Sequence, residues 1–190
     1  MRGKTLTRRI LSLLFAAALL LVPSNFYARR APALLQPNIS INGFFSTDRV
    51  QRGTTLQAAL VMDIPDGFHV NSSRPLSSFS VPTTVKIEAP RGMRVSAVSF
   101  PRAVVRKLSF SNDQLAVYEG RAVMRFNIIV PANREMGVME LRARIRYQSC
   151  NDEVCFPPVT REVTMPIAVV GANEAVKRIN GNLFGGRRRR

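Results

Sequence analysis

Between residues 138 and 148 the chain reads VMELRARIRYQ, and its apolar side chains recur at every second position. In an extended strand, this spacing places all the apolar residues on one face and the charged residues on the other. A helix would need a period near 3.6 and would mix the two sets. The segment therefore predicts a β-strand with one buried and one solvated face, as in an antiparallel sheet. The apolar set is Met139, Leu141, Ala143, Ile145 and Tyr147.

The same alternation recurs in RAVMRFNIIV at 121–130 and in EVTMPIAV at 162–169. Turn residues such as PDG at 65–67 and APRG at 89–92 separate further strand candidates. No segment after the first 35 residues sustains a helical apolar stripe over three turns. About eight short strands in about 135 residues predict an all-β domain at 36–170, an immunoglobulin-like antiparallel β-sandwich. The further candidates are 39–45, 54–62, 68–71, 84–88 and 94–100.

The first 33 residues predict a signal peptide for export to the periplasm. Four basic residues at 2–9 precede an apolar run at 10–22, which is the order of a secretory signal. That run is shorter than the roughly 20 residues that a membrane-spanning helix needs. We therefore expect cleavage somewhere in 24–33, with an uncleaved anchor as the alternative.

The net charge of +16 suggests nucleic-acid binding until it is divided along the chain. Residues 1–35 carry six basic and no acidic residues, 36–170 carry 16 and 11, and 171–190 carry six and one. The predicted domain is thus only mildly basic, and no nucleic-acid partner is expected. Residues 171–190 predict a flexible basic tail that ends in Arg187 to Arg190. We expect the tail to be solvated, with contact to an anionic membrane surface as the alternative.

Cys150 and Cys155 are the two cysteines of the chain, and they lie between two strand candidates with four residues between them. A structural staple is one interpretation, although a loop this short constrains the unfolded chain by only about 2 kcal/mol. A metal site is a weaker one, because zinc needs three or four ligands. The single histidine, His69, is distant in sequence and is expected to be a half-buried strand residue.

A working dithiol is the third interpretation, because a disulfide in a short surface loop can be attacked and reformed without unfolding the domain. Asp152 and Glu153 lie between the cysteines, and negative charge there disfavours a thiolate. Solvation of a turn is the simpler role for these two acidic residues. The residues alone leave the staple and the dithiol open.

The segment YQSCNDEVCFPPVTREVTMPI resembles the cysteine segment of the N-terminal periplasmic domain of the thiol:disulfide interchange protein DsbD and of related stand-alone domains. The likeness extends through IPDGFHVNSSRPL, VPTTVKIEAPRGM and FSNDQLAVYEG, and it covers most of residues 40–170. Domains of this family have an immunoglobulin-like fold, and their cysteine pair carries electrons in the periplasm.

The resemblance implies that Cys150 and Cys155 form a redox pair, with no cofactor beyond that disulfide. A separate membrane electron donor of the DsbD/CcdA type would reduce the pair. The clients would be oxidised periplasmic proteins, namely disulfide isomerases and thioredoxin-like proteins, including those of cytochrome c maturation. Cys155 would attack the client and Cys150 would resolve.

The resemblance also implies an aromatic shield over the cysteines. Phe110 in RKLSFSNDQ is the best match, and an ordinary core phenylalanine is its alternative. Tyr147 and Phe156 flank the cysteines and are expected to pack beneath their loop. The competing function is a periplasmic interaction module in which the pair is only a local staple.

Overall fold

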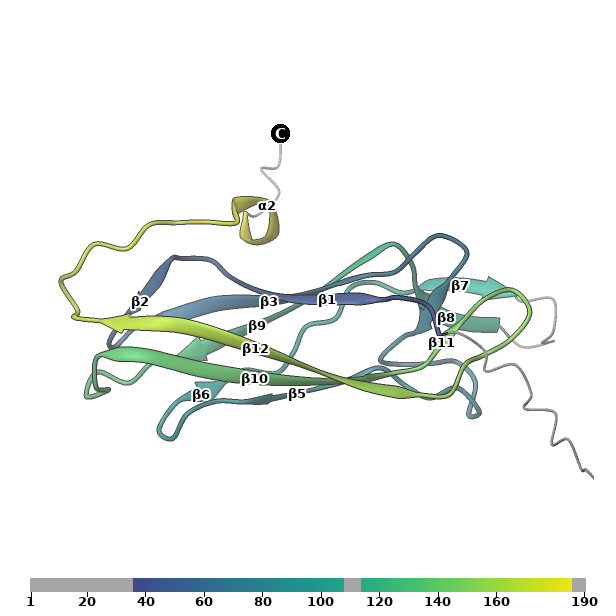
Figure 1. The fold of residues 1–190 in the computed structure, drawn as a ribbon, viewed down its shortest axis with the longest axis horizontal. Coiled ribbons are helices and arrows are strands. Elements are labelled where there is room, and N and C mark those ends of the chain that lie inside the picture. The colour runs from purple at the N-terminus through teal and green to yellow at the C-terminus, as the bar shows by residue number, and fades with distance from the viewer. Residues whose placement is uncertain (1–35, 108–113, 186–190) are drawn as a thin grey trace, which may run out of the picture. The chain divides into compact units, whose positions relative to one another are not determined.

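The computed structural model describes residues 36–107 and 114–185, and these residues form strands almost throughout (Figure 1). Twelve strands and one helical turn occur in the described part of the chain. In chain order they are β1 (Ser40–Phe45), β2 (Arg49–Gln51), β3 (Thr55–Asp63), β4 (His69–Asn71), β5 (Thr84–Glu88), β6 (Arg94–Val95), β7 (Val104–Lys107), β8 (Gln114–Tyr118), β9 (Arg121–Ile129), β10 (Gly137–Tyr147), β11 (Ser149–Cys150), β12 (Val159–Val170) and α2 (Gly181–Phe184).

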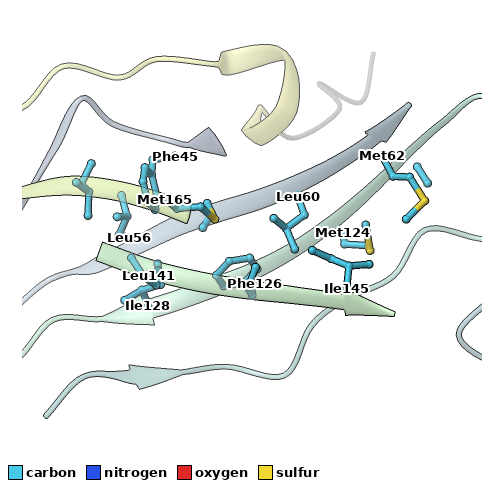
Figure 2. Close-up of a cluster of buried hydrophobic side chains, with 14 of the residues drawn as sticks. Phe45, Leu56, Leu60, Met62, Met124, Phe126, Ile128, Leu141, Ile145 and Met165 are labelled. Carbon is cyan, nitrogen blue, oxygen red and sulfur yellow. The ribbon is translucent and has the colours of Figure 1, made fainter. Parts of the chain in front are cut away.

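Two four-stranded sheets make the sandwich, one in the order β1-β3-β9-β6 and the other in the order β2-β12-β10-β5. Their strands pair antiparallel, except that β2 runs parallel to β12. Figure 2 shows the apolar side chains of β3 and β9 meeting those of β10 and β12 between the sheets. The predicted all-β, immunoglobulin-like sandwich is therefore confirmed.

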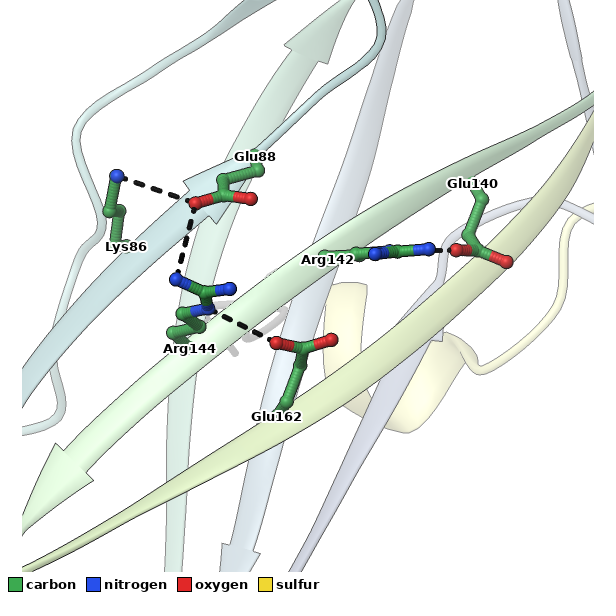
Figure 3. A network of polar contacts seen from close by, with 6 residues as sticks. All are labelled: Lys86, Glu88, Glu140, Arg142, Arg144 and Glu162. Atoms are coloured by element: carbon green, nitrogen blue, oxygen red, sulfur yellow. Dashed lines mark hydrogen bonds and ion pairs between the residues drawn. The ribbon is translucent and has the colours of Figure 1, made fainter.

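The apolar residues that alternate along β9 and β10 are the ones buried between the two sheets. The alternate apolar residues of β10 are at most 3% exposed, and so are those predicted from Ala122 to Val130, in β9 and directly after it. On the opposite face of β10, charged residues form ion pairs with β5 and β12, as Figure 3 shows around Arg144. Arg144 lies 3.1 Å from Glu162 and 3.9 Å from Glu88, and all three side chains are exposed. Exposed pairs of this kind contribute little to stability.

β1 of the first sheet packs closely against β12 of the second sheet. A Cβ built on Gly43 of β1 would lie 2.5 Å from Cγ of Met165, a distance that real side chains do not reach. Glycine at this position therefore lets the backbone of β1 pack directly on the Met165 side chain.

A third sheet has the order β11-β4-β8-β7, and its strand β11 contains Cys150. Its strands β4 and β8 follow β3 and precede β9 along the chain. Strands β3 and β9 pair as far as Asp63 and Arg121, and pairing resumes in β4 and β8 at Val70 and Tyr118. Six residues fill the gap on one side and two on the other, so residues 64–69 form a bulge. The N–H of Ile64 still donates to the carbonyl of Gly120, at 2.8 Å. The bulge shifts the register by four residues, while Val70 of β4 and Tyr118 of β8 still pack in the same core as the sandwich.

Several strands were not predicted from sequence, namely β2, β7, β8 and β11. The run LAVY of β8 is buried on both faces, so it has no alternation to detect. Strand β11 has only two residues and exists because β4 pairs with it. In the candidate at 94–100, Arg94 and Val95 pair with β9 as β6. The next contact with β9 is a separate bridge at Ser99. One extra residue on its side of that gap breaks the strand.

The segment expected as a flexible tail differs from that expectation over residues 171–185. The N–H of Ile179 donates to the carbonyl of Ser46 at 2.9 Å, and the N–H of Lys177 donates to Asp48 at the same distance. Arg125 of β9 donates to the carbonyl of Leu183, whose side chain is buried. The backbone groups of this stretch find partners in the loop between β1 and β2 and on β9, which the charge pattern did not predict. Residues 1–33 and Arg187 to Arg190 lie outside the described residues.

No helix among the described residues is long and apolar enough to cross a membrane.

Candidate functional site

Cys150 and Cys155 form a disulfide, with their sulfurs 2.05 Å apart and their Cα atoms 4.0 Å apart. β10 belongs to the second sheet and ends at Tyr147; after Gln148, the chain pairs with β4 of the third sheet as β11. Cys155 then leads back toward β12 of the second sheet. The disulfide therefore closes the loop at the point where the chain leaves one sheet for another and returns.

The loop between the cysteines is held by its own hydrogen bonds. Oδ1 of Asn151 accepts from the N–H groups of Glu153 and Val154, at 2.9 and 2.7 Å. The N–H of Phe156 donates to the carbonyl of Ser149 at 2.9 Å. These bonds do not involve sulfur, so they can hold the two cysteines close together whether or not the disulfide is formed.

The two cysteines differ in exposure. Cys150 is completely buried in β11, whereas Cys155 is partly exposed. The sequence suggested a surface loop for both, and for Cys150 that was wrong: pairing with β4 makes it a strand residue. Only the Cys155 side of the disulfide is therefore open to an attacking thiolate in this conformation.

Gln148 joins the strands around the disulfide. Its side-chain oxygen accepts from the amide of Asn71 at 3.0 Å and from the N–H of Val81 at 3.3 Å. Its amide nitrogen donates to the carbonyl of Phe156 at 3.1 Å. One side chain thus connects β4, the loop before β5 and the residue after Cys155. Neither Gln148 nor Asn71 was singled out from sequence. The polar residues of HVNSS in a predicted strand could have signalled Asn71, but they give no signal for Gln148.

The aromatic residues beside the cysteines occupy two different positions. Phe156 is 4% exposed, and its ring centroid lies 6.1 Å from that of Phe68 in the bulge. Tyr147 is buried in the core of the sandwich, opposite Val159 of β12, and burial raises the pKa of its phenol. Phe156 is therefore the aromatic that packs at the cysteine end. Phe110, the expected shield, lies outside the described residues.

A pocket of about 430 Å³ opens beside β4, and the bulge forms one of its walls. His69, Arg106, Glu119 and Asp152 line it together with residues of the bulge. Two hydrogen bonds of 2.7 Å join the Arg106 guanidinium to the Glu119 carboxylate. This pairing lowers the pKa of Glu119 and raises that of Arg106. Burial lowers the pKa of His69, against the attraction of Glu119 and Asp152.

Asp152 lines this pocket and is exposed, and Glu153 is also exposed. Among the described residues, no group of three or more histidine, cysteine, aspartate or glutamate side chains is placed to hold a metal ion.

Fold and site together define a class: an immunoglobulin-like β-sandwich that carries a short-range disulfide at one end, with one buried and one accessible cysteine. Such an arrangement is consistent with thiol-disulfide interchange. The sequence profile of the family described as "Thiol:disulfide interchange protein DsbD, N-terminal" matches residues 42–167. The chain belongs to this family, as the cysteine segment predicted.

Solved structures of similar proteins include the N-terminal domain of DsbD from Neisseria meningitidis in the reduced form. It is 16% identical, with a TM-score of 0.41, and the match covers 73% of this chain and 88% of that one. A complex of the DsbD and PilB N-terminal domains from the same organism matches at 20% identity and a TM-score of 0.44, covering 70% and 88%. The N-terminal periplasmic domain of ScsB from Proteus mirabilis is 11% identical, with a TM-score of 0.46, covering 75% and 51%. No curated protein matches the sequence.

Proposed function

We propose that this protein is a periplasmic carrier that passes reducing equivalents through Cys150 and Cys155 to oxidised proteins. The observation that carries the proposal is the unequal exposure of the two cysteines within a family of thiol:disulfide interchange domains. A bond that served only as a staple would gain nothing from leaving one cysteine partly exposed. The loop also has hydrogen bonds of its own, which would keep the thiols adjacent after reduction.

The exchange proceeds in two displacements. The Cys155 thiolate attacks a sulfur of the client disulfide, forms a mixed disulfide and releases one client thiolate. Cys150 then attacks Cys155, restores the Cys150–Cys155 bond and releases the second client thiolate. The client gains two electrons and the cysteine pair loses two. The exposure of Cys155 supports its role as the attacking residue, and the burial of Cys150 supports the resolving role.

The partners follow from the family and from the described redox centre. This site contains one cysteine pair, so a separate donor of the DsbD/CcdA type would reduce it again. Thioredoxin-like proteins and disulfide isomerases are the proposed clients, and the structure solved with a PilB domain supports a protein partner of some kind for this family. Export by the predicted signal at 1–33 would place the protein with them, and the described domain needs no cofactor to carry electrons.

A redox titration tests the proposal. The purified protein is equilibrated in thiol buffers of graded potential, and the bond is followed by alkylation and mass. We expect a potential above about −300 mV, the limit below which structural disulfides lie, together with exchange onto a thioredoxin-like protein. A Cys150→Ser variant should still form a mixed disulfide through Cys155 but should not resolve it. A bond that resists reduction until the domain unfolds would instead indicate a staple in an interaction module.

A further inference from the structure

His69 lies directly opposite Cys150 in the pairing of β4 with β11. Facing residues of an antiparallel pair project to the same side of the sheet, with Cβ atoms about 4.5–5.5 Å apart. The His69 side chain is 3% exposed and Cys150 is 0% exposed. The imidazole and the buried sulfur therefore share one environment that is nearly closed to bulk water.

The imidazole has hydrogen-bonding capacity that the fold does not use. Nε2 of His69 is buried and has no hydrogen-bond partner among residues 36–107 and 114–185. Leaving a buried polar atom unpaired costs about 1–3 kcal/mol, so such an atom needs an explanation. His69 also lines the 430 Å³ pocket, which is large enough to hold water beside the ring. A structural role alone does not account for a histidine whose buried Nε2 has no partner among the described residues.

Burial and the charged groups around the ring act on its pKa in opposite directions. Burial lowers the pKa of His69, so the ring is neutral and able to accept a proton at pH 7. The carboxylates of Glu119 and Asp152 attract the imidazolium once it forms, and Arg106 opposes them. The charged residues that line the pocket with His69 are Asp66, Arg106, Lys107, Glu119 and Asp152.

Cys150 needs a proton acceptor that bulk water cannot provide. In the reduced protein it must lose its proton before it can attack the mixed disulfide at Cys155, because the thiolate is the nucleophile. A charged sulfur at a site with no exposure is unfavourable unless a neighbouring group takes the proton and offsets the charge. His69 is the titratable residue paired with Cys150 across the sheet.

We propose that His69 accepts the proton of the Cys150 thiol in the resolving step, directly or through one water in the pocket. This inference rests on the exchange function proposed above. The proton moves from Cys150 to the imidazole, and the Cys150 thiolate attacks Cys155. The Cys150–Cys155 bond forms as the bond from Cys155 to the client breaks. The departing client thiolate then takes a proton from the imidazolium, so His69 returns to its neutral form.

A two-phase reaction separates the roles of the residues. The reduced protein is mixed with dithiobis-nitrobenzoate, an aromatic disulfide whose released thiolate is coloured. The first release reports attack by Cys155, and the second, independent of reagent concentration, reports resolution by Cys150. We expect His69→Gln to leave the first phase unchanged and to slow the second about 100-fold at pH 7. The second phase in the variant should rise with hydroxide concentration, whereas in the unaltered protein it should level off once His69 is neutral.

Two variants serve as controls. Cys150→Ser should abolish the second phase, which assigns it. Thr83→Val removes a buried hydroxyl near the site but no titratable group, and its second phase should stay within about twofold. If His69→Gln resolves at the original rate with the original pH profile, the inference about His69 is overturned and the exchange function stands. If the unaltered protein shows no first phase, the exchange function itself fails.

A second measurement needs no variant and covers the case in which His69→Gln does not fold. His69 is the single histidine of the chain, so its ring signals can be followed by NMR without ambiguity. If the ring exchanges a proton with Cys150, its titration must differ between the dithiol and the disulfide, because coupled groups share their titration steps. Identical titration curves in the two redox states would overturn the proposal.

Discussion

The interior of the sandwich and the cysteine end differ in the polarity of their buried side chains. Between the two large sheets the buried side chains are apolar, as Figure 2 shows from Phe45 to Met165. The five buried polar side chains of the described residues all lie in or beside the third sheet. They are His69, Asn71, Ser72, Thr83 and Ser149. Apolar burial in the sandwich stabilises the fold. The buried polar groups at the cysteine end do not, because apolar residues at these positions would avoid the cost of burying polar atoms.

Most of the buried polar atoms that lack a hydrogen-bond partner among the described residues lie at the cysteine end. Of the buried polar atoms without a partner in the described residues, three belong to His69, Asn71 and Ser149, on the facing strands β4 and β11. Unpaired buried polar atoms are uncommon and expensive, so their concentration on two facing strands marks a site. Burial of apolar residues in the sandwich offsets the cost, and the register changes between the two regions at the bulge.

The largest expected effect comes from the sandwich. Leu141→Ala removes a completely buried side chain from the centre of β10 and should lower the free energy of unfolding by about 2–5 kcal/mol. The reduction potential of Cys150–Cys155 should not change, because the loop around it keeps its own bonds. Urea unfolding and a redox titration of the same variant check both parts. A shift in potential that corresponds to the same free energy as the loss of stability would mean that the sandwich and the disulfide are energetically coupled.

A smaller loss of stability, with a redox effect, is expected at the cysteine end. Gln148→Ala leaves the amide of Asn71 and the N–H of Val81 without their acceptor and should cost about 1–3 kcal/mol. It should also change the rate of thiol exchange, because the link to the carbonyl of Phe156 is lost. Gln57→Ala on the exposed face of β3 is the matched control and should stay within about 0.5 kcal/mol. Equal effects of the two glutamines would contradict the importance of this connection.

The smallest expected effect is a dependence of stability on pH that comes from the cysteine end. The folded protein holds the pKa of His69 below its ordinary value of 6.5, so below pH 6.5 the unfolded chain binds a proton that the folded protein does not. The free energy of unfolding is therefore unaffected by His69 above pH 6.5 and decreases as the pH falls below it. The slope is at most about 1.4 kcal/mol per pH unit.

Urea unfolding between about pH 5 and 8 measures this slope. His69→Gln should flatten the curve just below pH 6.5. Glu119 should not contribute in this range, because its lowered pKa places its loss of stability at more acid pH, below 4.5. An unchanged curve in the variant would mean that His69 is protonated equally in the folded and unfolded chains.

The sequence predicted the parts of this protein that depend on local periodicity. β5 was placed at its observed bounds, and β9, β10 and β12 were found from alternation, because each has one buried and one solvated face. The family was predicted as well, from a cysteine segment whose residues are contiguous in the chain. The chemistry of the cysteine pair remained open between staple and dithiol, because spacing alone does not set exposure.

Tertiary structure decided what the sequence could not. Whether Cys150 is buried depends on β4, some 80 residues earlier, pairing with a strand of two residues. The bonds from Gln148 to Asn71 and Val81 likewise join residues 77 and 67 positions apart. A period along the chain reports which side of a strand faces the core. The partner that a residue meets across a sheet depends on register, and register is set by the packing of the whole domain.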